Sequence, residues 1–126
     1  MAARILIAED ELPLRAMVTR ALMQDGHDVV ATADGSEALE AFTNAKKPFD
    51  LLLTDIKMPM MDGIALALAV ARDDPELPIL LMTGYADQRE RASGLDALIH
   101  DVIVKPFTLL EIQYAVAGAL SAAPRR

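Results

Sequence analysis

The sequence of 126 residues contains no cysteine, which excludes disulfide bonds, thiolate metal sites and thiol-based catalysis. It also lacks any apolar run close to the ~20 residues that a membrane-spanning helix requires. The longest candidate, Ile64–Ala71, fits a buried helix instead. The N-terminus passes directly into a strand-like segment and does not have the layout of a signal peptide. These absences predict a cytoplasmic protein that does not enter a membrane.

Basic residues are outnumbered, with 12 Lys and Arg against 19 Asp and Glu and a net charge of −7. An acidic domain repels phosphate backbones and anionic lipids, so we expect neither direct nucleic-acid binding nor membrane-surface binding. The charge is compatible with a cation site, but a solvated acidic surface explains it equally well. A hydrophobic fraction of 53% argues against disorder and favours a single domain over residues 1–126.

Short apolar runs alternate with helical patterns along the whole chain. Four of these runs are continuous, which is typical of strands buried on both faces of a parallel sheet. They are residues 5–8, 51–53, 79–82 and 102–104, and a weaker fifth run covers residues 29–31. With five helices expected between and after the strands, the predicted fold is α/β, a doubly wound five-stranded parallel sheet.

Apolar stripes and caps locate the helices. The first helix has a stripe at residues 14, 17, 18, 21 and 22, and Pro13 fits only in its first turn. The fourth, residues 87–94, has almost no apolar stripe and is expected to be the least firmly packed. The other helix starts are indicated by a cap of Asp34 with Glu37, by Asp62-Gly63, and by the capping box Thr108 to Glu111.

Polar residues stand where four of the predicted strands end. Because the carboxyl ends of parallel strands share one edge, and ligands bind beyond that edge, these residues are expected to lie together. Taken singly, each is more often a solvated turn or a cap; their coincidence at one edge favours a functional site. They are Glu9-Asp10-Glu11, Asp55, Thr83 and Lys105.

The residue types suggest phosphoryl and metal chemistry. Glu9, Asp10 and Asp55 would raise one another's pKa unless a cation lies between them. Mg²⁺ fits, because it takes one or two carboxylates and keeps several waters. An ionised Asp55 can then attack a phosphoryl donor as a nucleophile. Lys105 offers a positive charge, and Thr83 a hydroxyl donor, for the negative charge that spreads over the transferring group.

Four blocks have a highly specific order and spacing. They are Ile5-Leu-Ile-Ala-Glu-Asp-Glu11, Phe49-Asp-Leu-Leu-Leu-Thr-Asp-Ile-Lys-Met-Pro-Met-Met-Asp-Gly63, Met82-Thr-Gly84 and Val104-Lys-Pro-Phe107. Together they resemble the CheY-like receiver domains of two-component response regulators, over a core of about residues 4–121. The resemblance implies a flavodoxin-like sheet with strand order 2-1-3-4-5.

The resemblance also implies a function. Asp55 would accept a phosphoryl group from a phosphohistidine on a sensor histidine kinase or phosphotransfer protein. The altered domain would then change its contacts with a downstream protein, which the sequence does not identify, as a monomer or a phosphorylation-promoted dimer. The usual output surface of the family is formed by the fourth and fifth helices with the fifth strand. Such a domain is a signalling switch, and its chemistry is limited to its own phosphorylation and dephosphorylation.

Particular roles follow from the same resemblance. Asp10, Asp55 and the main-chain carbonyl of Lys57 would bind Mg²⁺ or Mn²⁺, with Glu9 acting through a water. The remaining implied roles are phosphoryl contacts from Thr83 and Lys105, a cis peptide bond at Pro106, and a close start of the third helix at Gly63.

One departure from the family concerns the switch. Val102 stands where members usually have an aromatic residue that rotates when the threonine engages phosphate, so another element must carry the change. Lys57 and Tyr85 occupy positions that modulate phosphoryl lifetime, and we expect Tyr85 to shield the phosphoryl group and slow its hydrolysis.

The alternatives to a stand-alone receiver are a fragment of a longer regulator, a metal-dependent phosphatase and a flavodoxin-like carrier. The chain ends soon after its last predicted helix, which favours a stand-alone receiver; a fragment of a longer regulator with a DNA-binding or enzymatic effector is the alternative. A metal-dependent phosphatase using Asp55 usually needs a second aspartate two positions later, where this chain has Lys57. A flavodoxin-like carrier would need a phosphate-binding loop where Glu9-Asp10-Glu11 stand.

Overall fold

The computed structural model of the protein describes residues 2–84, 93–95 and 97–123. Its centre is a five-stranded sheet with the order β2-β1-β3-β4-β5, in which all neighbouring strands are parallel. The predicted sheet and strand order are therefore confirmed, and every apolar run lies in a strand. The strands are β1 (Arg4–Ala8), β2 (Asp28–Thr32), β3 (Leu51–Asp55), β4 (Ile79–Thr83) and β5 (Asp101–Val104).

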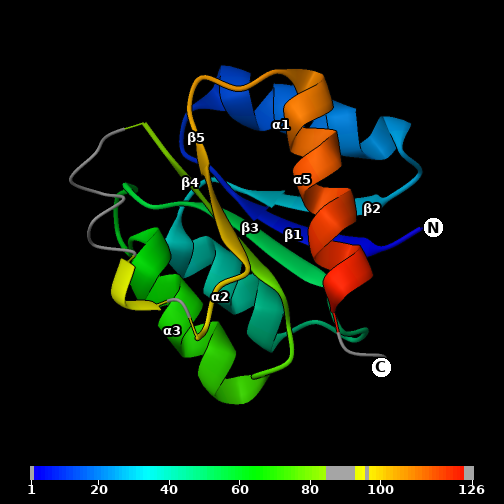
Figure 1. Cartoon of the computed structure of the whole chain (residues 1–126). Coiled ribbons are helices and arrows are strands. Elements are labelled where there is room, and N and C mark those ends of the chain that lie inside the picture. The colour runs from blue at the N-terminus through cyan, green and yellow to red at the C-terminus, as the bar shows by residue number, and fades with distance from the viewer. Residues whose placement is uncertain (1, 85–92, 96, 124–126) are drawn as a thin grey trace.

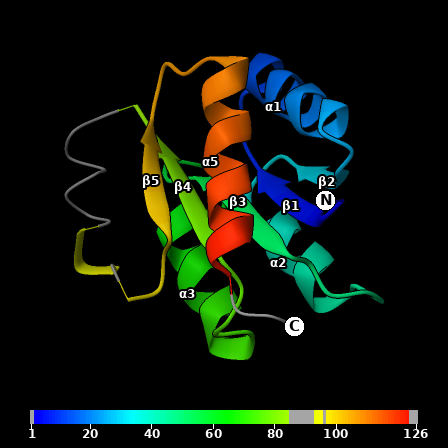
Figure 2. The same cartoon turned by 45° about the vertical axis from the view of Figure 1, so that its right-hand side comes forward.

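Helices cover both faces of the sheet, with α1 and α5 on one face and α2 and α3 on the other (Figures 1 and 2). Every residue of β3 and β4 is buried, which explains why their sequences are continuously apolar. Each helical layer encloses its own apolar cluster against the sheet. The helices are α1 (Leu12–Gln24), α2 (Gly35–Thr43), α3 (Gly63–Asp73) and α5 (Leu109–Ala122).

The helix count differs from the expectation of five. The described residues contain four α-helices and one short 3₁₀ helix, η1, at Ser93–Leu95. The expected fourth helix, residues 87–94, falls mainly on residues outside those described. The sequence offers almost no apolar stripe there.

The predicted caps are confirmed. Asp34 Oδ1 accepts a hydrogen bond from the Glu37 N–H at 2.8 Å, and Asp62 caps α3 in the same way. Thr108 and Glu111 form the reciprocal capping box of α5. Pro13 lies in the first turn of α1, where its missing N–H leaves no helical bond unmade. Local sequence signals thus mark where α2, α3 and α5 begin.

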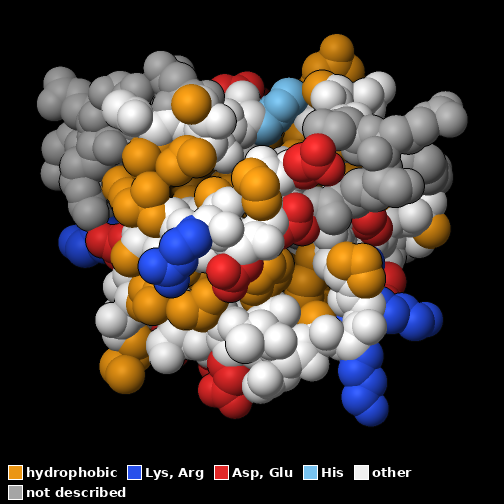
Figure 3. Space-filling view, turned by 90° about the horizontal axis from the view of Figure 1, so that it is seen from below, with side chains coloured by type: hydrophobic (Ala, Val, Ile, Leu, Met, Phe, Trp, Pro, Cys, Tyr) orange, Lys and Arg blue, Asp and Glu red, His pale blue; other side chains and the backbone are white. Residues whose placement is uncertain are grey.

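The surface away from the carboxyl ends of the strands carries charge of both signs. Seen from below the view of Figure 1, basic and acidic side chains are scattered among hydrophobic ones (Figure 3). No helix within the described residues has the length and apolar character needed to cross a bilayer.

Candidate functional site

The carboxyl ends of the strands bring the predicted polar residues to one edge. Asp55 is the last residue of β3 and is 4% exposed, while Thr83 is buried at the end of β4. Glu9 follows β1 and is also buried, whereas Asp10 beside it is exposed. The edge therefore combines buried carboxylates with one that faces solvent.

Lys105 links two of the carboxylates. Its Nζ lies 3.0 Å from Asp55 Oδ2 and 3.1 Å from Glu9 Oε1, so one ammonium group bridges residues from β1 and β3. The lysine follows β5, and its N–H donates to the Thr83 carbonyl at 2.7 Å. A buried carboxylate such as Glu9 requires a partner of this kind, because an unpaired buried charge is strongly unfavourable.

The acidic residues form a cluster that fits a hard cation. Glu9, Asp10 and Asp55 each offer one carboxylate oxygen, and these oxygens lie within 4.8 Å of one another. The donor set is all oxygen, as Mg²⁺ and Mn²⁺ prefer. Backbone donors orient two of the carboxylates: the Glu11 N–H bonds Glu9 Oε2 at 3.0 Å, and the Ile56 N–H bonds Asp55 Oδ1 at 2.9 Å.

Burial sets the electrostatics of the cluster. Burial raises the pKa of Asp55, and the nearby charge of Asp10 raises it further, while the hydrogen bond from Lys105 opposes the shift. Burial also raises the pKa of Glu9, against the hydrogen bonds from Glu11 and Lys105. Burial alone would lower the pKa of Lys105, but its bonds to Asp55 and Glu9 raise it overall. The cluster therefore carries more negative charge than one lysine offsets, which favours binding of a further cation.

A glycine allows α3 to begin against the end of β3. The Gly63 N–H donates to the Ile56 carbonyl at 2.8 Å. A Cβ atom on Gly63 would lie 1.9 Å from the carbonyl oxygen of Asp55, so no other residue fits without a backbone shift. The absence of a Cβ at Gly63 therefore allows α3 to begin close to the end of β3. Across the site, the Lys105–Pro106 peptide bond is cis, as the resemblance implied.

The structure adds residues that the sequence did not single out. A cleft of about 760 Å³ at this edge contains the predicted Asp10, Glu11, Asp55, Lys57, Lys105 and Pro106, and is completed by Met58, Pro59 and Gly84. Arg15 Nη1 donates to the main-chain carbonyl of Glu9 at 2.9 Å. Met58, Pro59 and Gly84 flank residues that were predicted. The bond from Arg15 to the Glu9 carbonyl spans six positions and carried no sequence signal.

Two of the residues predicted to modulate switching or phosphoryl lifetime are Val102 and Tyr85. Val102 is half-buried in β5 and packs against the apolar cluster beneath α2 and α3. Tyr85 lies outside the described residues. Their proposed roles in switching and phosphoryl lifetime therefore stay predictions.

Comparisons with known proteins agree with this geometry. The transcriptional regulatory protein PrrA of Mycobacterium tuberculosis is 32% identical over 117 residues, covering 93% of this chain and 49% of PrrA. The response regulator MprA of Mycobacterium ulcerans is 36% identical over 112 residues, covering 89% and 47%. The chain thus spans about half the length of these curated relatives.

Solved structures of response regulators are similar to this chain as well. The chemotaxis response regulator CheY4 of Vibrio cholerae superposes with a TM-score of 0.84 at 28% identity, covering 94% of this chain and 99% of CheY4. A family model described as the response regulator receiver domain matches residues 5–117. The chain therefore belongs to the response regulator receiver domain family, whose members are signalling proteins of two-component systems.

Proposed function

We propose that this domain is a phosphorylation-dependent switch in which Asp55 accepts a phosphoryl group from a phosphohistidine donor. The observation that carries the proposal is the setting of Asp55 at the end of β3. It is 4% exposed, reaches the cleft, and has Lys105 Nζ at 3.0 Å and two further carboxylates beside it. A carboxylate nucleophile that is paired with a lysine ammonium group, in a cleft lined by further oxygen ligands, is suited to phosphoryl transfer.

The proposed transfer is a single displacement. A carboxylate oxygen of Asp55 attacks the phosphorus atom, and the O–P bond forms as the donor's N–P bond breaks. The electron pair of that bond stays on the imidazole nitrogen. Lys105 offsets negative charge on the phosphoryl oxygens, and the Thr83 hydroxyl donates to one of them. Dephosphorylation is attack by water on the same phosphorus, which returns the Asp55 carboxylate and inorganic phosphate.

A divalent cation is part of the proposal. Asp10, Asp55 and the main-chain carbonyl of Lys57 would hold Mg²⁺ or Mn²⁺, and Glu9 would act through a water. When bound, the ion supplies positive charge that offsets the crowded carboxylates and the phosphoryl oxygens. Glu9 is fully buried and does not line the cleft, whereas Asp10 and Asp55 do, which supports an indirect role for Glu9.

The output surface is proposed to lie over β5 and α5. Apolar side chains are exposed there: Leu110 is 73% exposed, Tyr114 84% and Val104 46%. Exposed apolar residues that share one surface favour a protein contact. Because Val102 has no ring to rotate, the change should reach this surface through another element. A downstream protein, or a second copy of the domain, is the proposed partner.

A second candidate is the receiver part of a longer regulator. It is favoured by the length of the relatives, since this chain matches only 49% of PrrA. Immunoblotting of the cells that make the protein distinguishes a stand-alone receiver from a longer regulator by the apparent mass of the protein. A species near the 13.6 kDa of this chain supports the stand-alone switch, and one about twice that size supports the longer regulator.

Intact-protein mass spectrometry after incubation with acetyl phosphate and Mg²⁺ tests the proposal. We expect one phosphoryl adduct that requires the metal and is lost in Asp55→Asn. Asp62→Asn is the matched control, because Asn also caps a helix. Asp62 lies between β3 and α3, and it is not a member of the carboxylate cluster of Glu9, Asp10 and Asp55. An adduct that persists in Asp55→Asn, or its absence from folded native protein, contradicts the proposal.

The proposed shielding by Tyr85 has its own measurement. Loss of the adduct with time should be faster in Tyr85→Ala than in native protein. Faster loss from the native protein would refute the shielding role.

A further inference from the structure

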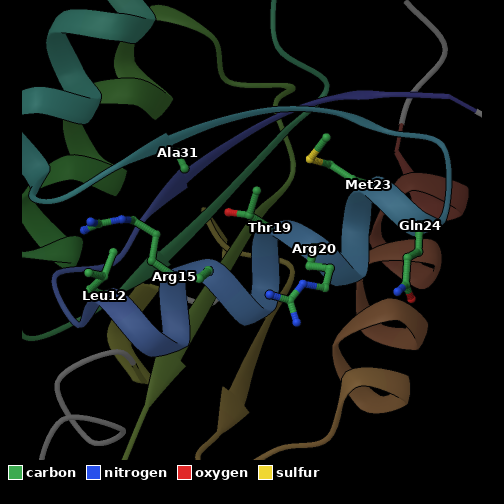
Figure 4. A pocket seen from close by; sticks show the side chains of 8 residues that line it. Leu12, Arg15, Thr19, Arg20, Met23, Gln24 and Ala31 are labelled. Atoms are coloured by element: carbon green, nitrogen blue, oxygen red, sulfur yellow. The ribbon is translucent and has the colours of Figure 1, made fainter.

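A second hollow lies between α1 and the outer edge of the sheet, lined by side chains of α1 and by Ala31 of β2 (Figure 4). Its volume is about 570 Å³. Its apolar lining includes Leu12 and Met23, which are 64% and 60% exposed. Such large exposed apolar side chains, gathered along one groove, favour a binding surface. The other residues of this α1–β2 groove are Arg15, Ala16, Thr19, Arg20, Gln24 and Ala31.

The groove borders the free edge of β2. This strand is at the end of the sheet order and pairs with β1 alone among the described strands. The Asp28 N–H donates to the Ala3 carbonyl, and the Thr32 carbonyl accepts from the Glu9 N–H. A parallel ladder uses every second residue of each strand, so the N–H and C=O groups of Val29 and Ala31 point outward. They are available to another strand.

The side chains of Val29 and Ala31 point to the face of the sheet that α1 covers. Val29 packs against the apolar cluster under α1 and α5, and Ala31 lines the groove itself. Successive strand residues alternate between faces, so a strand added to β2 would also turn every second side chain toward α1. The groove follows α1 from Leu12 to Met23, about 16 Å at 1.5 Å per residue. That length matches about five residues of extended chain.

The charge of the residues that line the groove indicates which kind of segment it binds. Arg15 and Arg20 border the groove, and none of its lining residues carries a carboxylate. This is a local excess of positive charge on a chain with a net charge of −7. A symmetric pairing of two β2 edges would bring the arginines of both copies together, which is unfavourable. An acidic partner segment would instead meet opposite charge.

We propose that the free edge of β2 and the α1–β2 groove form a docking site for an extended acidic segment of another protein. The segment adds a sixth strand beside β2, pairing with the backbone groups of Val29 and Ala31. Its alternate apolar side chains fill the groove against Leu12 and Met23, and its carboxylates lie near Arg20. This is β-strand addition, in which backbone bonds provide affinity and the pockets select side chains. The proposal is independent of phosphorylation at Asp55.

The probe is a fluorescein-labelled peptide of eight residues in which valine and glutamate alternate, measured by fluorescence anisotropy. We expect a dissociation constant below about 1 mM, and at least about tenfold weaker binding of a peptide in which lysine replaces glutamate. Arg20→Glu should weaken binding of the acidic peptide at least about tenfold. Arg72→Glu, an equal charge change on the exposed end of α3, should leave it unchanged.

Two further variants test the strand geometry. Ala31→Pro removes an outward N–H that the β1 ladder does not use, and should abolish binding. If that variant does not fold, Ala16→Glu places a carboxylate in the groove from an exposed helical position and should have the same effect.

Amide hydrogen exchange provides the direct test. The Val29 and Ala31 amides should exchange more slowly when the peptide is bound. Absence of binding up to about 1 mM, equal binding of the lysine peptide, or binding without protection of these two amides would overturn the proposal. The last result would indicate a helical or flexible occupant.

Discussion

Gly63→Ala is expected to lower the free energy of unfolding by about 3 kcal/mol, the upper part of the range for forced overpacking. The new Cβ would lie 1.9 Å from the Asp55 carbonyl oxygen, where real Cβ contacts are not closer than 3.0 Å. The position of the Cβ is fixed by the backbone and the carbonyl belongs to the backbone, so relief requires α3 and the end of β3 to separate by about 1 Å. The Gly63 N–H bond to Ile56 would be strained by the same movement.

The assay is urea unfolding followed by circular dichroism, with Gly118→Ala as the matched control. A Cβ on Gly118 meets no atom within 4 Å, and the residue lies inside α5. The control should therefore gain about 0.5–1 kcal/mol from the helix preference of alanine. With a urea dependence of about 1–3 kcal/mol per M, the loss in Gly63→Ala corresponds to an unfolding midpoint lower by about 1–3 M. A Gly63→Ala variant within about 0.5 kcal/mol of native protein would refute the close-approach reasoning.

Three further predictions concern charge. Because the pKa of Asp55 is raised, its contribution to the free energy of unfolding is fully present below pH 3.8 and is lost as the pH rises through the folded pKa. With a chelator present, the stability of Asp55→Asn should therefore fall less than that of native protein over this pH range. Mg²⁺ should raise the melting temperature of native protein more than that of Asp55→Asn. Burial lowers the pKa of His27, whose Nδ1 accepts a hydrogen bond from the Ala3 N–H at 3.0 Å. The contribution of His27 to the free energy of unfolding is therefore present above pH 6.5 and is lost as the pH falls through the folded pKa. His27→Asn keeps a hydrogen-bond acceptor for the Ala3 N–H but does not titrate. In urea unfolding at successive pH values, this variant should not show the loss of stability at acidic pH. A native protein whose stability over acidic pH matches that of His27→Asn would contradict the assignment.

Much of the fold could be predicted because its signals are local. A continuous apolar run is sufficient to indicate a strand buried on both faces, and β3 and β4 are buried throughout. Caps such as Asp34 and Thr108 depend on hydrogen bonds within one helical turn. The segment at residues 87–94 lacks such signals, and the helix expected there was not confirmed.

The site was harder to predict in detail because its contacts join distant positions. Polar residues at strand ends correctly indicated which groups meet, since parallel strands share a carboxyl edge. The bridge from Lys105 to Glu9 links residues 96 positions apart, and no local pattern encodes it. The Arg15 bond to the Glu9 carbonyl likewise depends on how α1 packs against the sheet. Buried charge pairs and close backbone approaches are set by tertiary packing, so they require the structure.

The most direct test of the central claim is chemical mapping of the phosphorylated residue. Protein incubated with acetyl phosphate and Mg²⁺ would be reduced with sodium borohydride, which converts an aspartyl phosphate to homoserine, and its peptides sequenced by mass spectrometry. The phosphoacceptor assignment predicts homoserine at position 55 alone. Homoserine at Asp10 or another aspartate instead of Asp55, with the protein folded, would contradict it.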